Sequence, residues 1–294
     1  MNYNRRKFIK QTAGISSGFA LATLAGNSIF TNDLFEEMKK LKSFGLQLYT
    51  LREDLPKDPK AVLKQIASFG YKQIESYEGK DGMFWGMGHT GFKKYMDELG
   101  MTIISSHCDI TNNFERKANE AAAIGMKYLF CPWKGPQKKL DDYKKFAGEF
   151  NVCGEICRKA GIRFGYHNHD YSFKELEGEL PQDVMMKGTN PDTVDFEMDI
   201  YWVVATGHNP IDWFNKYPNR FRACHVKDRA KNPGTDNGKN SIDLGAGSID
   251  FSKILKAGAK SGMQYFIVEQ EAYPIGTPLQ SVQKNAAYMK MLKV

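Results

Sequence analysis

Apolar and polar positions follow two alternating patterns from Ser43 to the end of the chain. Short apolar runs such as Thr102–His107 indicate strands, and longer runs with apolar residues three and four positions apart, such as Leu140–Ala160, indicate amphipathic helices. Strands that alternate with helices in this way are typical of a parallel α/β protein. The strands are expected at residues 44–49, 71–77, 102–107, 128–133, 163–169, 194–199, 221–228 and 264–269.

Eight strand–helix pairs over about 250 residues are the number that a (β/α)8 barrel needs. The alternative is a doubly wound sheet, which usually has a glycine-rich turn after its first strand, whereas Leu48–Arg52 contains no glycine. No Pro- or Ser-rich linker divides the chain. We therefore predict one α/β domain, a single (β/α)8 TIM barrel over residues 43–294, with its chemistry at the C-terminal ends of the strands.

The first thirty residues have a different composition. The basic pair Arg5 and Arg6 precedes an apolar run, rich in Gly, Ala and Ser, from Thr12 to Gly26. This arrangement is typical of a twin-arginine export signal, and it predicts a signal peptide over residues 1–30, a polar leader over residues 31–42 and a periplasmic or exported protein. An ordinary basic, amphipathic first helix is the alternative. The run is shorter than the ~20 strongly apolar residues of a membrane span, so we expect no stable membrane anchor.

The formal net charge of +7 is concentrated in that segment, because residues 1–30 hold four basic residues and no acidic one. The rest of the chain carries only about +3. No stripe of Lys and Arg interleaved with aromatic residues occurs, so nucleic acid is not an expected partner. The five cysteines are an odd number without C-x-x-C spacing, and we interpret all of them as core residues.

Carboxylate and imidazole side chains gather at the predicted C-terminal ends of the strands. Members of one strand are two residues apart, so they point to the same side, into the mouth of a barrel. Carboxylates that face one another in a closed site repel strongly unless they are protonated or bridged by a cation. Mixed carboxylate and imidazole ligation suits Mn²⁺, Co²⁺, Fe²⁺ or Zn²⁺, so we expect a divalent metal ion as cofactor. The residues are Glu75, His107, His167, His169, Glu197, Asp199, His225, Lys227, Glu269 and Glu271.

Several of these side chains also have a purely structural interpretation. Asp199 precedes a helical segment and could be only its N-cap. Glu269 could form a salt bridge with Lys227. A single His on a strand is more often a satisfied core residue than a ligand.

Six short segments occur in the order that a known family shows: Gly45–Tyr49, Tyr166–His169, Glu197–Trp202, His225–Asp228, Leu244–Asp250 and Ile267–Gln270. With them, residues 44–294 resemble the xylose isomerase-like sugar isomerases and epimerases. That group also includes inosose dehydratases, ketose 3-epimerases and endonuclease-IV-type proteins. The endonuclease branch fits poorly, because it implies a multi-zinc cluster and a DNA-binding face.

The resemblance implies a barrel in which one divalent ion is held by a Glu, an Asp, a His and a Glu from strands five to eight. Asp199, His225 and Glu269 match the last three of these ligands. The strand-five Glu is absent; His167 stands in its place, and His169 is another candidate. The family's epimerases relay protons with two glutamates on opposite faces of the substrate. The absence of the strand-five Glu therefore also puts this two-base relay in question for the present chain.

The implied chemistry is metal-dependent isomerisation or epimerisation of a saccharide, through proton abstraction next to a carbonyl and a metal-stabilised enediolate. Glu269 would accept the proton, His167 or His169 would return or relay one, and Lys227 would lie near the developing negative charge. A lyase or dehydratase is the alternative, because the same enediolate can expel a β-leaving group from a 3-keto-glycoside or an inosose. A non-catalytic periplasmic saccharide-binding barrel is a third interpretation, which the missing glutamate favours.

The expected partner is a small-molecule saccharide. Sugar faces stack on aromatic rings, and Trp85, Trp133 and Trp202 lie in loops beyond strand ends. His107 and Arg229 are further candidate substrate contacts, Arg229 for an acidic group. Export argues against phosphorylated sugars, which are cytoplasmic metabolites. Barrels of this family often self-associate, so a homo-oligomer is an expectation as well.

Overall fold

The computed structural model describes Leu41 and residues 43–294. The predicted signal peptide (residues 1–30) and, apart from Leu41, the predicted leader (residues 31–42) lie outside the described residues, so both stay predictions. Among the described helices, none combines the length and the apolarity that crossing a bilayer requires.

Eight strands form a closed barrel in the order β1-β10-β7-β6-β5-β4-β3-β2. All neighbouring strands in this ring are parallel, and β1 pairs with β10 to close it. The predicted (β/α)8 barrel is therefore confirmed. The strands are β1 (Gly45–Gln47), β2 (Gln73–Tyr77), β3 (Thr102–His107), β4 (Tyr128–Cys131), β5 (Arg163–His167), β6 (Val194–Asp199), β7 (Phe221–Val226) and β10 (Tyr265–Val268).

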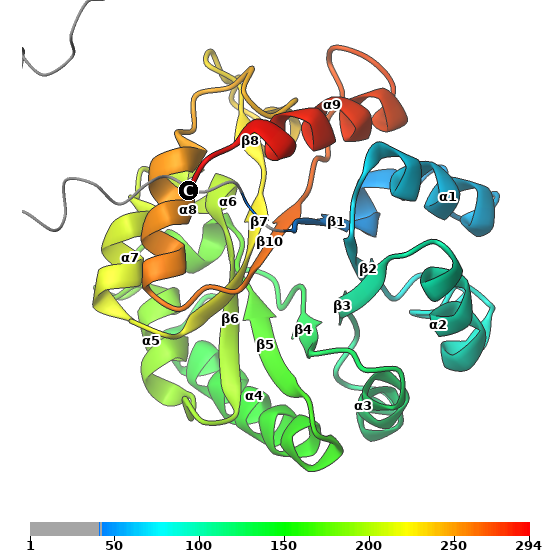
Figure 1. Cartoon of the computed structure of the whole chain (residues 1–294). Coiled ribbons are helices and arrows are strands. Elements are labelled where there is room, and N and C mark those ends of the chain that lie inside the picture. Colours follow the sequence, from blue (N-terminus) through cyan, green and yellow to red (C-terminus); the bar gives the residue numbers. More distant parts are fainter. Residues whose placement is uncertain (1–40, 42) are drawn as a thin grey trace, which may run out of the picture. The chain divides into compact units, whose positions relative to one another are not determined.

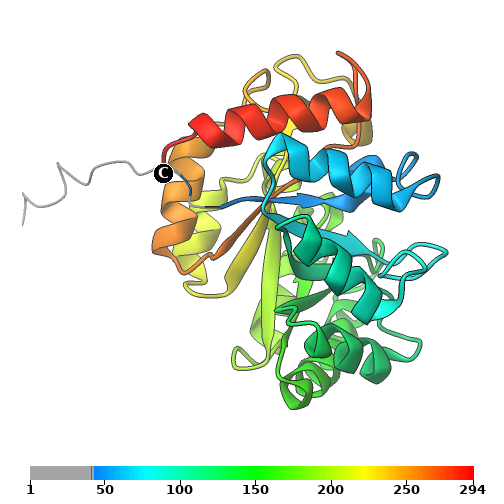
Figure 2. The same ribbon diagram turned by 45° about the vertical axis from the view of Figure 1, so that its right-hand side comes forward.

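The helices lie outside this ring of strands (Figure 1). In both ribbon views the first and last helices, α1 and α9, lie side by side (Figures 1 and 2), and they are in contact. The helices are α1 (Pro59–Phe69), α2 (Gly88–Glu98), α3 (Phe114–Ala123), α4 (Leu140–Ala160), α5 (Pro181–Gly188), α6 (Ile200–Ala205), α7 (Pro210–Lys216), α8 (Phe251–Lys260) and α9 (Pro278–Met291).

Helix α8 illustrates how the sequence specifies these elements. Asp250 is its N-cap and accepts a hydrogen bond from the backbone N–H of Lys253 at 3.3 Å. Phe251, Ile254 and Leu255 are buried, as their three- and four-residue spacing predicts. The helix thus covers the barrel with one apolar face.

Short elements between the main ones were not predicted. The 3₁₀ helices η3 (Leu48–Leu51), η4 (Asp170–Phe173) and η5 (Asn237–Lys239) each form a single turn. The long polar loop after β7 contains a two-stranded antiparallel ladder of β8 (Asp228–Arg229) and β9 (Ser241–Ile242). Segments this short carry no periodic pattern, because one turn or one ladder pair is shorter than a period.

The glycine-containing segment Leu244–Asp250 has a structural role in that loop. The carboxylate of Asp228 accepts hydrogen bonds from the backbone N–H groups of Gly245 at 2.9 Å and Gly247 at 3.1 Å. A Cβ atom on Gly247 would lie 2.1 Å from Asp228 Oδ1. Glycine is therefore required for the backbone to approach this carboxylate.

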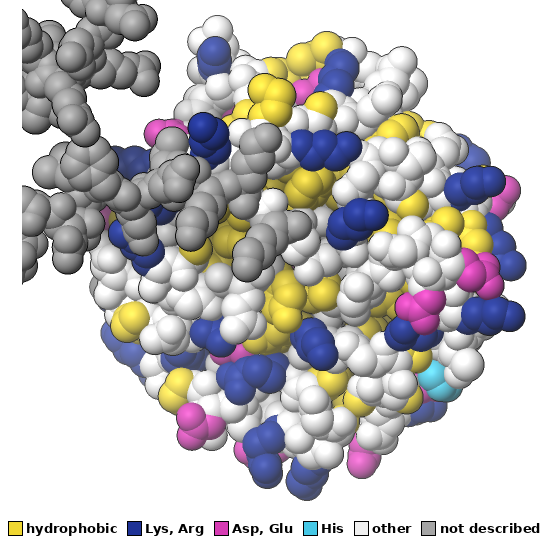
Figure 3. Space-filling model, in the orientation of Figure 1, with side chains coloured by type: hydrophobic (Ala, Val, Ile, Leu, Met, Phe, Trp, Pro, Cys, Tyr) yellow, Lys and Arg dark blue, Asp and Glu magenta, His cyan; other side chains and the backbone are white. Residues whose placement is uncertain are grey.

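The core confirms the interpretation of the cysteines, since all five are buried and none forms a disulfide. Inside the barrel, Phe130 occupies space next to Gly165, where a Cβ would lie 2.4 Å from the ring. On the face shown in Figure 3, Lys and Arg side chains are spread among other residues and do not gather in a stripe.

Candidate active site

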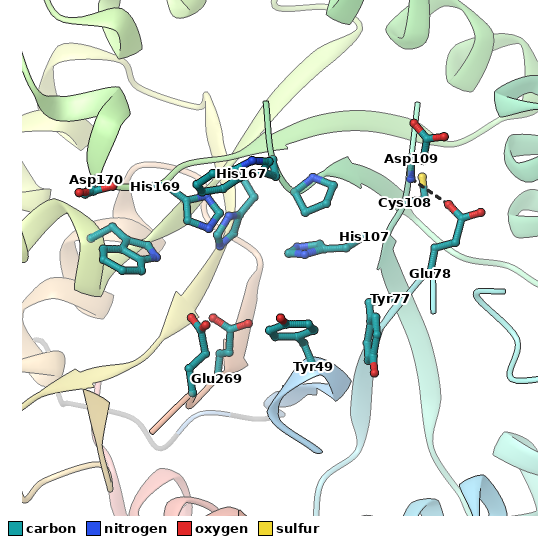
Figure 4. A pocket seen from close by; sticks show the side chains of 14 residues that line it. Tyr49, Tyr77, Glu78, His107, Cys108, Asp109, His167, His169, Asp170 and Glu269 are labelled. Atoms are coloured by element: carbon teal, nitrogen blue, oxygen red, sulfur yellow. Dashed lines mark hydrogen bonds between the residues drawn. The ribbon is translucent and has the colours of Figure 1, made fainter. Parts of the chain in front are cut away.

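A pocket of about 600 Å³ lies at the C-terminal ends of the barrel strands. Residues at or just beyond the ends of seven of the eight strands line it, as expected for the catalytic end of such a barrel. Figure 4 shows the imidazoles of His107, His167 and His169 on one side, with Tyr49 and Glu269 across from them. The lining includes Tyr49, Tyr77, His107, Trp133, His167, His169, Trp202, Glu269 and Glu271.

Four side chains from β5, β6, β7 and the residue after β10 meet beside this pocket, and we call them the ligand quartet: His167, Asp199, His225 and Glu269. One ligand atom of each lies within 4.8 Å of all the others. His225 Nδ1 is 3.0 Å from His167 Nε2 and 3.1 Å from Glu269 Oε2. Asp199 Oδ2 is 3.6 Å from His167 Nε2 and 3.9 Å from His225 Nδ1.

The opposite nitrogen of His225 belongs to a second quartet, formed with Glu75 of β2, His107 of β3 and Glu197 of β6. His225 Nε2 lies 2.8 Å from Glu75 Oε1 and 3.3 Å from Glu197 Oε2. His107 Nε2 lies 2.8 Å from Glu197 Oε2 and 3.2 Å from Glu75 Oε1. His225 is thus the residue that the two quartets share.

Lys227 balances part of the negative charge in the ligand quartet. Its Nζ lies 3.3 Å from Glu269 Oε2 and 3.5 Å from Asp199 Oδ2, and it also pairs with Glu271. Although burial opposes the charge, these carboxylates hold the pKa of Lys227 well above its ordinary value. Despite burial, the charges of Lys227 and His225 hold the pKa of Glu269 well below its ordinary value. Glu269 is therefore an ionised carboxylate at the pocket wall.

The two histidines of β5 and its following turn are neutral. Burial lowers the pKa of both His167 and His169 well below the ordinary imidazole value. Neutral imidazoles keep a lone pair that can bind a metal ion or accept a proton. His167 Nδ1 and His169 Nδ1 are buried and have no hydrogen-bond partner among the described residues.

The ligand quartet fits a divalent transition-metal ion. It offers two imidazole nitrogens and two carboxylate oxygens, which suit Mn²⁺, Fe²⁺, Co²⁺ or Zn²⁺. A cation also accounts for the burial of Asp199 and Glu269 so near each other, because buried charges need a partner. The structure brings His167, and not His169, into the quartet, so His167 is the candidate for the position of the missing strand-five Glu.

The structural interpretations of two of these residues are confirmed, and neither excludes a place in the ligand quartet. Asp199 Oδ1 caps α6 by accepting a hydrogen bond from the backbone N–H of Trp202 at 3.3 Å, whereas its Oδ2 faces the quartet. The predicted salt bridge between Glu269 and Lys227 is also present.

The aromatic residues expected to bind a sugar divide into two groups. Trp133 is 54% exposed at the pocket rim, packs edge-on against His169 and lines the pocket, and Trp202 lines it too. Trp85 does not line the pocket: it is buried, packs against Tyr77, and donates a hydrogen bond from Nε1 to Ser76 Oγ at 3.1 Å. The position of Trp85 therefore corrects its prediction as a sugar contact.

Arg229 is likewise not among the pocket residues. It lies in β8, and its Nη2 is 3.5 Å from Asn237 Oδ1. The expected contact of Arg229 with an acidic substrate group is thus not supported by its position, because the β8–β9 ladder holds the backbone of Arg229 against Ser241.

Two pocket tyrosines were missed as site residues. Tyr49 and Tyr77 follow or end β1 and β2, and their rings pack edge to face at 5.2 Å. Their signal in the sequence was the one used for the other residues, an aromatic side chain at the end of a predicted strand.

Comparison with known proteins supports the fold. The family model for the xylose isomerase-like TIM barrel matches residues 63–292. A crystal structure of a sugar phosphate isomerase/epimerase from Parabacteroides distasonis is 31% identical, with a TM-score of 0.72, and the match covers 87% of this chain and 96% of that chain. A structure described as the IOLI protein with a bound zinc atom shares the fold at 14% identity and a TM-score of 0.66, covering 83% of this chain and 95% of that one.

Among curated relatives, an inosose dehydratase from Lacticaseibacillus casei is 27% identical over 163 residues. The match covers 51% of this chain and 54% of the relative, so the chain spans about half the length of the curated relatives it matches. The family match and the Parabacteroides structure extend over most of the barrel. The chain belongs to the xylose isomerase-like TIM barrel family.

Proposed function

We propose that this chain is a metal-dependent lyase that acts on a keto-saccharide or a keto-polyol. It would remove the proton next to the carbonyl and expel a leaving group from the β-carbon. The observation that carries this proposal is the make-up of the ligand quartet, in which Glu269 is an ionised base and His167 stands where an epimerase has its second glutamate. Elimination needs one base at the carbon, whereas epimerisation by the family's relay needs two.

The atoms that would hold the metal ion are His167 Nε2, Asp199 Oδ2, His225 Nδ1 and Glu269 Oε2. When bound, the ion would supply Lewis-acid polarisation of the substrate's carbonyl and its neighbouring hydroxyl, which lowers the free energy of the charge that develops there.

The chain's own groups supply the remaining chemistry. Glu269 accepts the proton, because its low pKa keeps it ionised and it lines the pocket. The Lys227 ammonium, in contact with Glu269 and Asp199, stabilises negative charge nearby. His169, neutral and at the pocket wall, relays the proton that Glu269 has taken up: one ring nitrogen accepts it while the other gives a proton to the leaving oxygen. Trp133 at the rim stacks against the sugar.

Curated relatives support elimination, because those from Lacticaseibacillus casei and Clostridium botulinum are named inosose dehydratases. Isomerisation or epimerisation is the second candidate, and the Parabacteroides structure, described as a sugar phosphate isomerase/epimerase, favours it. The family therefore supports a small-molecule saccharide substrate in either case.

Mass spectrometry of products formed in D₂O separates the two reactions. The metal-loaded protein is incubated with an inosose, with a 3-keto-glycoside and with a simple ketose. The lyase yields a product that has lost water or the aglycone. An unchanged mass apart from deuterium incorporation would instead assign the isomerase, and no exchange at all would favour a saccharide-binding barrel.

Export through the twin-arginine route is a further part of the proposal, supported by Arg5, Arg6 and the apolar run that follows. The route carries folded proteins, so the metal ion would be bound before export. Cell fractionation tests this: the protein is expected in the periplasm or medium, and replacement of both arginines by lysine is expected to retain it inside. The expected homo-oligomer can be checked by size-exclusion chromatography with light scattering.

A further inference from the structure

The distances in the second quartet alternate. His225 Nε2 to Glu75 Oε1 and His107 Nε2 to Glu197 Oε2 are both 2.8 Å, whereas the two cross distances are 3.2 and 3.3 Å. Glu75 accepts hydrogen bonds from Gln47 Nε2 and Ser105 Oγ, so its short contact with His225 is an N–H donated by the imidazole, and His225 carries a proton on Nε2. The short contact between His107 Nε2 and Glu197 Oε2 holds one proton between these two atoms.

Glu75 is held in place as an acceptor by two neighbours in the barrel wall. Gln47 Nε2 donates to Glu75 Oε1 at 2.7 Å, and Ser105 Oγ donates to Glu75 Oε2 at 2.6 Å. The orientation of the Gln47 amide is fixed in turn, because its Oε1 accepts a hydrogen bond from the backbone N–H of Tyr49 at 3.0 Å. All three polar side chains are fully buried. Strands β1, β2 and β3 thus present an immobile carboxylate to His225.

We propose that Glu75 is a positioning residue for the metal site, an inference that rests on the proposed metal-dependent function. By accepting the Nε2–H of His225, Glu75 keeps that proton on Nε2, so a metal ion would displace the proton on the other nitrogen, Nδ1, which faces His167 and Glu269. A carboxylate that accepts the distal N–H of a ligating histidine also makes that ligand more basic. The second quartet supports the metal ligand and binds no ion of its own.

The competing interpretation is that the second quartet is itself a metal site. Two features argue against it. The alternation of short and long contacts is what two protons among four atoms produce, and Glu75 already accepts hydrogen bonds from Gln47 and Ser105. Glu197 Oε1 has no partner among the described residues, so Glu197 is held less firmly than Glu75.

The test is the zinc affinity of E75Q, measured by competition with a chromophoric chelator, together with zinc stoichiometry. We expect one zinc per wild-type chain and a dissociation constant for E75Q raised about 10- to 100-fold. E197Q should raise it less. D195N is the matched control, because Asp195 is a buried carboxylate on the same strand as Glu197, but it pairs with Arg163 and Tyr128. Its zinc affinity should stay within about threefold of wild type.

A second measurement on the wild type does not depend on the folding of a variant. Long-range ¹H–¹⁵N spectra of the histidines, of which the chain has six, report the tautomer, with His225 assigned by loss of its signals in H225Q. With zinc bound, we expect a protonated Nε2 and a metal-bound Nδ1 on His225. Metal on Nε2, two zinc ions per chain, or an unchanged affinity in folded E75Q would overturn the proposal. Failure of the wild type to bind any metal would instead overturn the proposed function.

Discussion

The ligand quartet and the second quartet each contain two imidazoles and two carboxylates, and they share His225. In the ligand quartet the distances from His225 Nδ1 to the other three ligand atoms run from 3.0 to 3.9 Å, and His167 and Glu269 reach the pocket wall. In the second quartet the contacts run from 2.8 to 3.3 Å, and donors from the barrel wall hold Glu75. We therefore propose that the same residue types serve as ligands in one quartet and as support in the other, according to what occupies their remaining lone pairs.

The largest expected effect comes from His225, because it belongs to both quartets. H225A should raise the metal dissociation constant by more than about 100-fold, beyond the effect of a supporting residue. It should also lower the free energy of unfolding by about 3–5 kcal/mol, since Glu75 and Glu197 lose a buried partner. Chelator competition and urea denaturation of the metal-free protein measure the two effects. A loss of affinity without a loss of stability would mean that the second quartet does not depend on His225.

Glu269 belongs only to the ligand quartet, so its replacement separates catalysis from support. E269Q should lower kcat by about 10²–10⁴-fold, as expected for loss of a general base, and leave the fold intact. Steady-state kinetics and circular dichroism provide the readouts. Turnover of E269Q close to that of the wild type would contradict the proposed role of Glu269 as the general base.

A pH effect should distinguish the second quartet in the metal-free protein. Burial and the charge of Glu75 raise the pKa of Glu197 to about 7, above the value of 4.5 for an ordinary glutamate. The folded state therefore binds this proton more tightly than the unfolded state does. Protonated Glu197 contributes fully to the free energy of unfolding below pH 4.5. This contribution is lost as the pH rises to 7, with a slope of at most about 1.4 kcal/mol per pH unit.

E197Q should flatten this part of the stability curve, measured by urea denaturation of metal-free protein between pH 4.5 and 7.5. The glutamine cannot ionise, so the fall in the free energy of unfolding across the window should be smaller in E197Q than in the wild type. D195N serves again as the control and should keep the wild-type slope. An identical slope in E197Q would show that Glu197 is not the group responsible.

The smallest effect is expected outside both quartets. Trp133 is exposed at the rim and contacts His169 but no member of the ligand quartet in the described contacts. W133A should raise KM about 2- to 10-fold with little change in kcat, because stacking contributes about 0.5–1.5 kcal/mol. W85F is the control, because Trp85 is a buried tryptophan that does not line the pocket, and it should leave KM near the wild-type value. A large fall in kcat for W133A would contradict this prediction, because it would show that Trp133 takes part in the chemical step.

The sequence predicted the barrel because hydrophobic periodicity over long segments is a strong signal. Thr102–His107, Leu140–Ala160 and Val194–Asp199 have the bounds that the pattern indicated. The position of candidate ligands at strand ends followed from the same pattern. Asp199, His225 and Glu269 were therefore found before the fold was known.

How these residues divide into two quartets could not be predicted. The register shifts by one residue between Ile74 and Glu75 where β2 pairs with β3, and between Phe196 and Glu197 where β6 pairs with β7. Such irregularities re-aim the side chains that follow them, and they leave no pattern in a single strand. The shifts lie in the pairings that bring His107 and His225 beside Glu75 and Glu197.

His167 and His169 illustrate a second limit. Both point to the same side if the strand continues, but β5 ends at His167 and η4 begins at Asp170. Only His167 is therefore placed by the barrel itself, and strand ends are the part of an element that sequence predicts least well. Trp85 and Arg229 were misassigned because the direction of a loop side chain depends on contacts that no periodic pattern indicates, such as those with Ser76 and Asn237.

Metal content of the purified protein tests the central claim most directly. The protein is purified without added metal and analysed by elemental mass spectrometry, beside a double variant, D199N with H225A, that removes two members of the ligand quartet. We expect close to one divalent ion per wild-type chain and none in the double variant. A folded wild type without bound metal, or a double variant that keeps its ion, would contradict it.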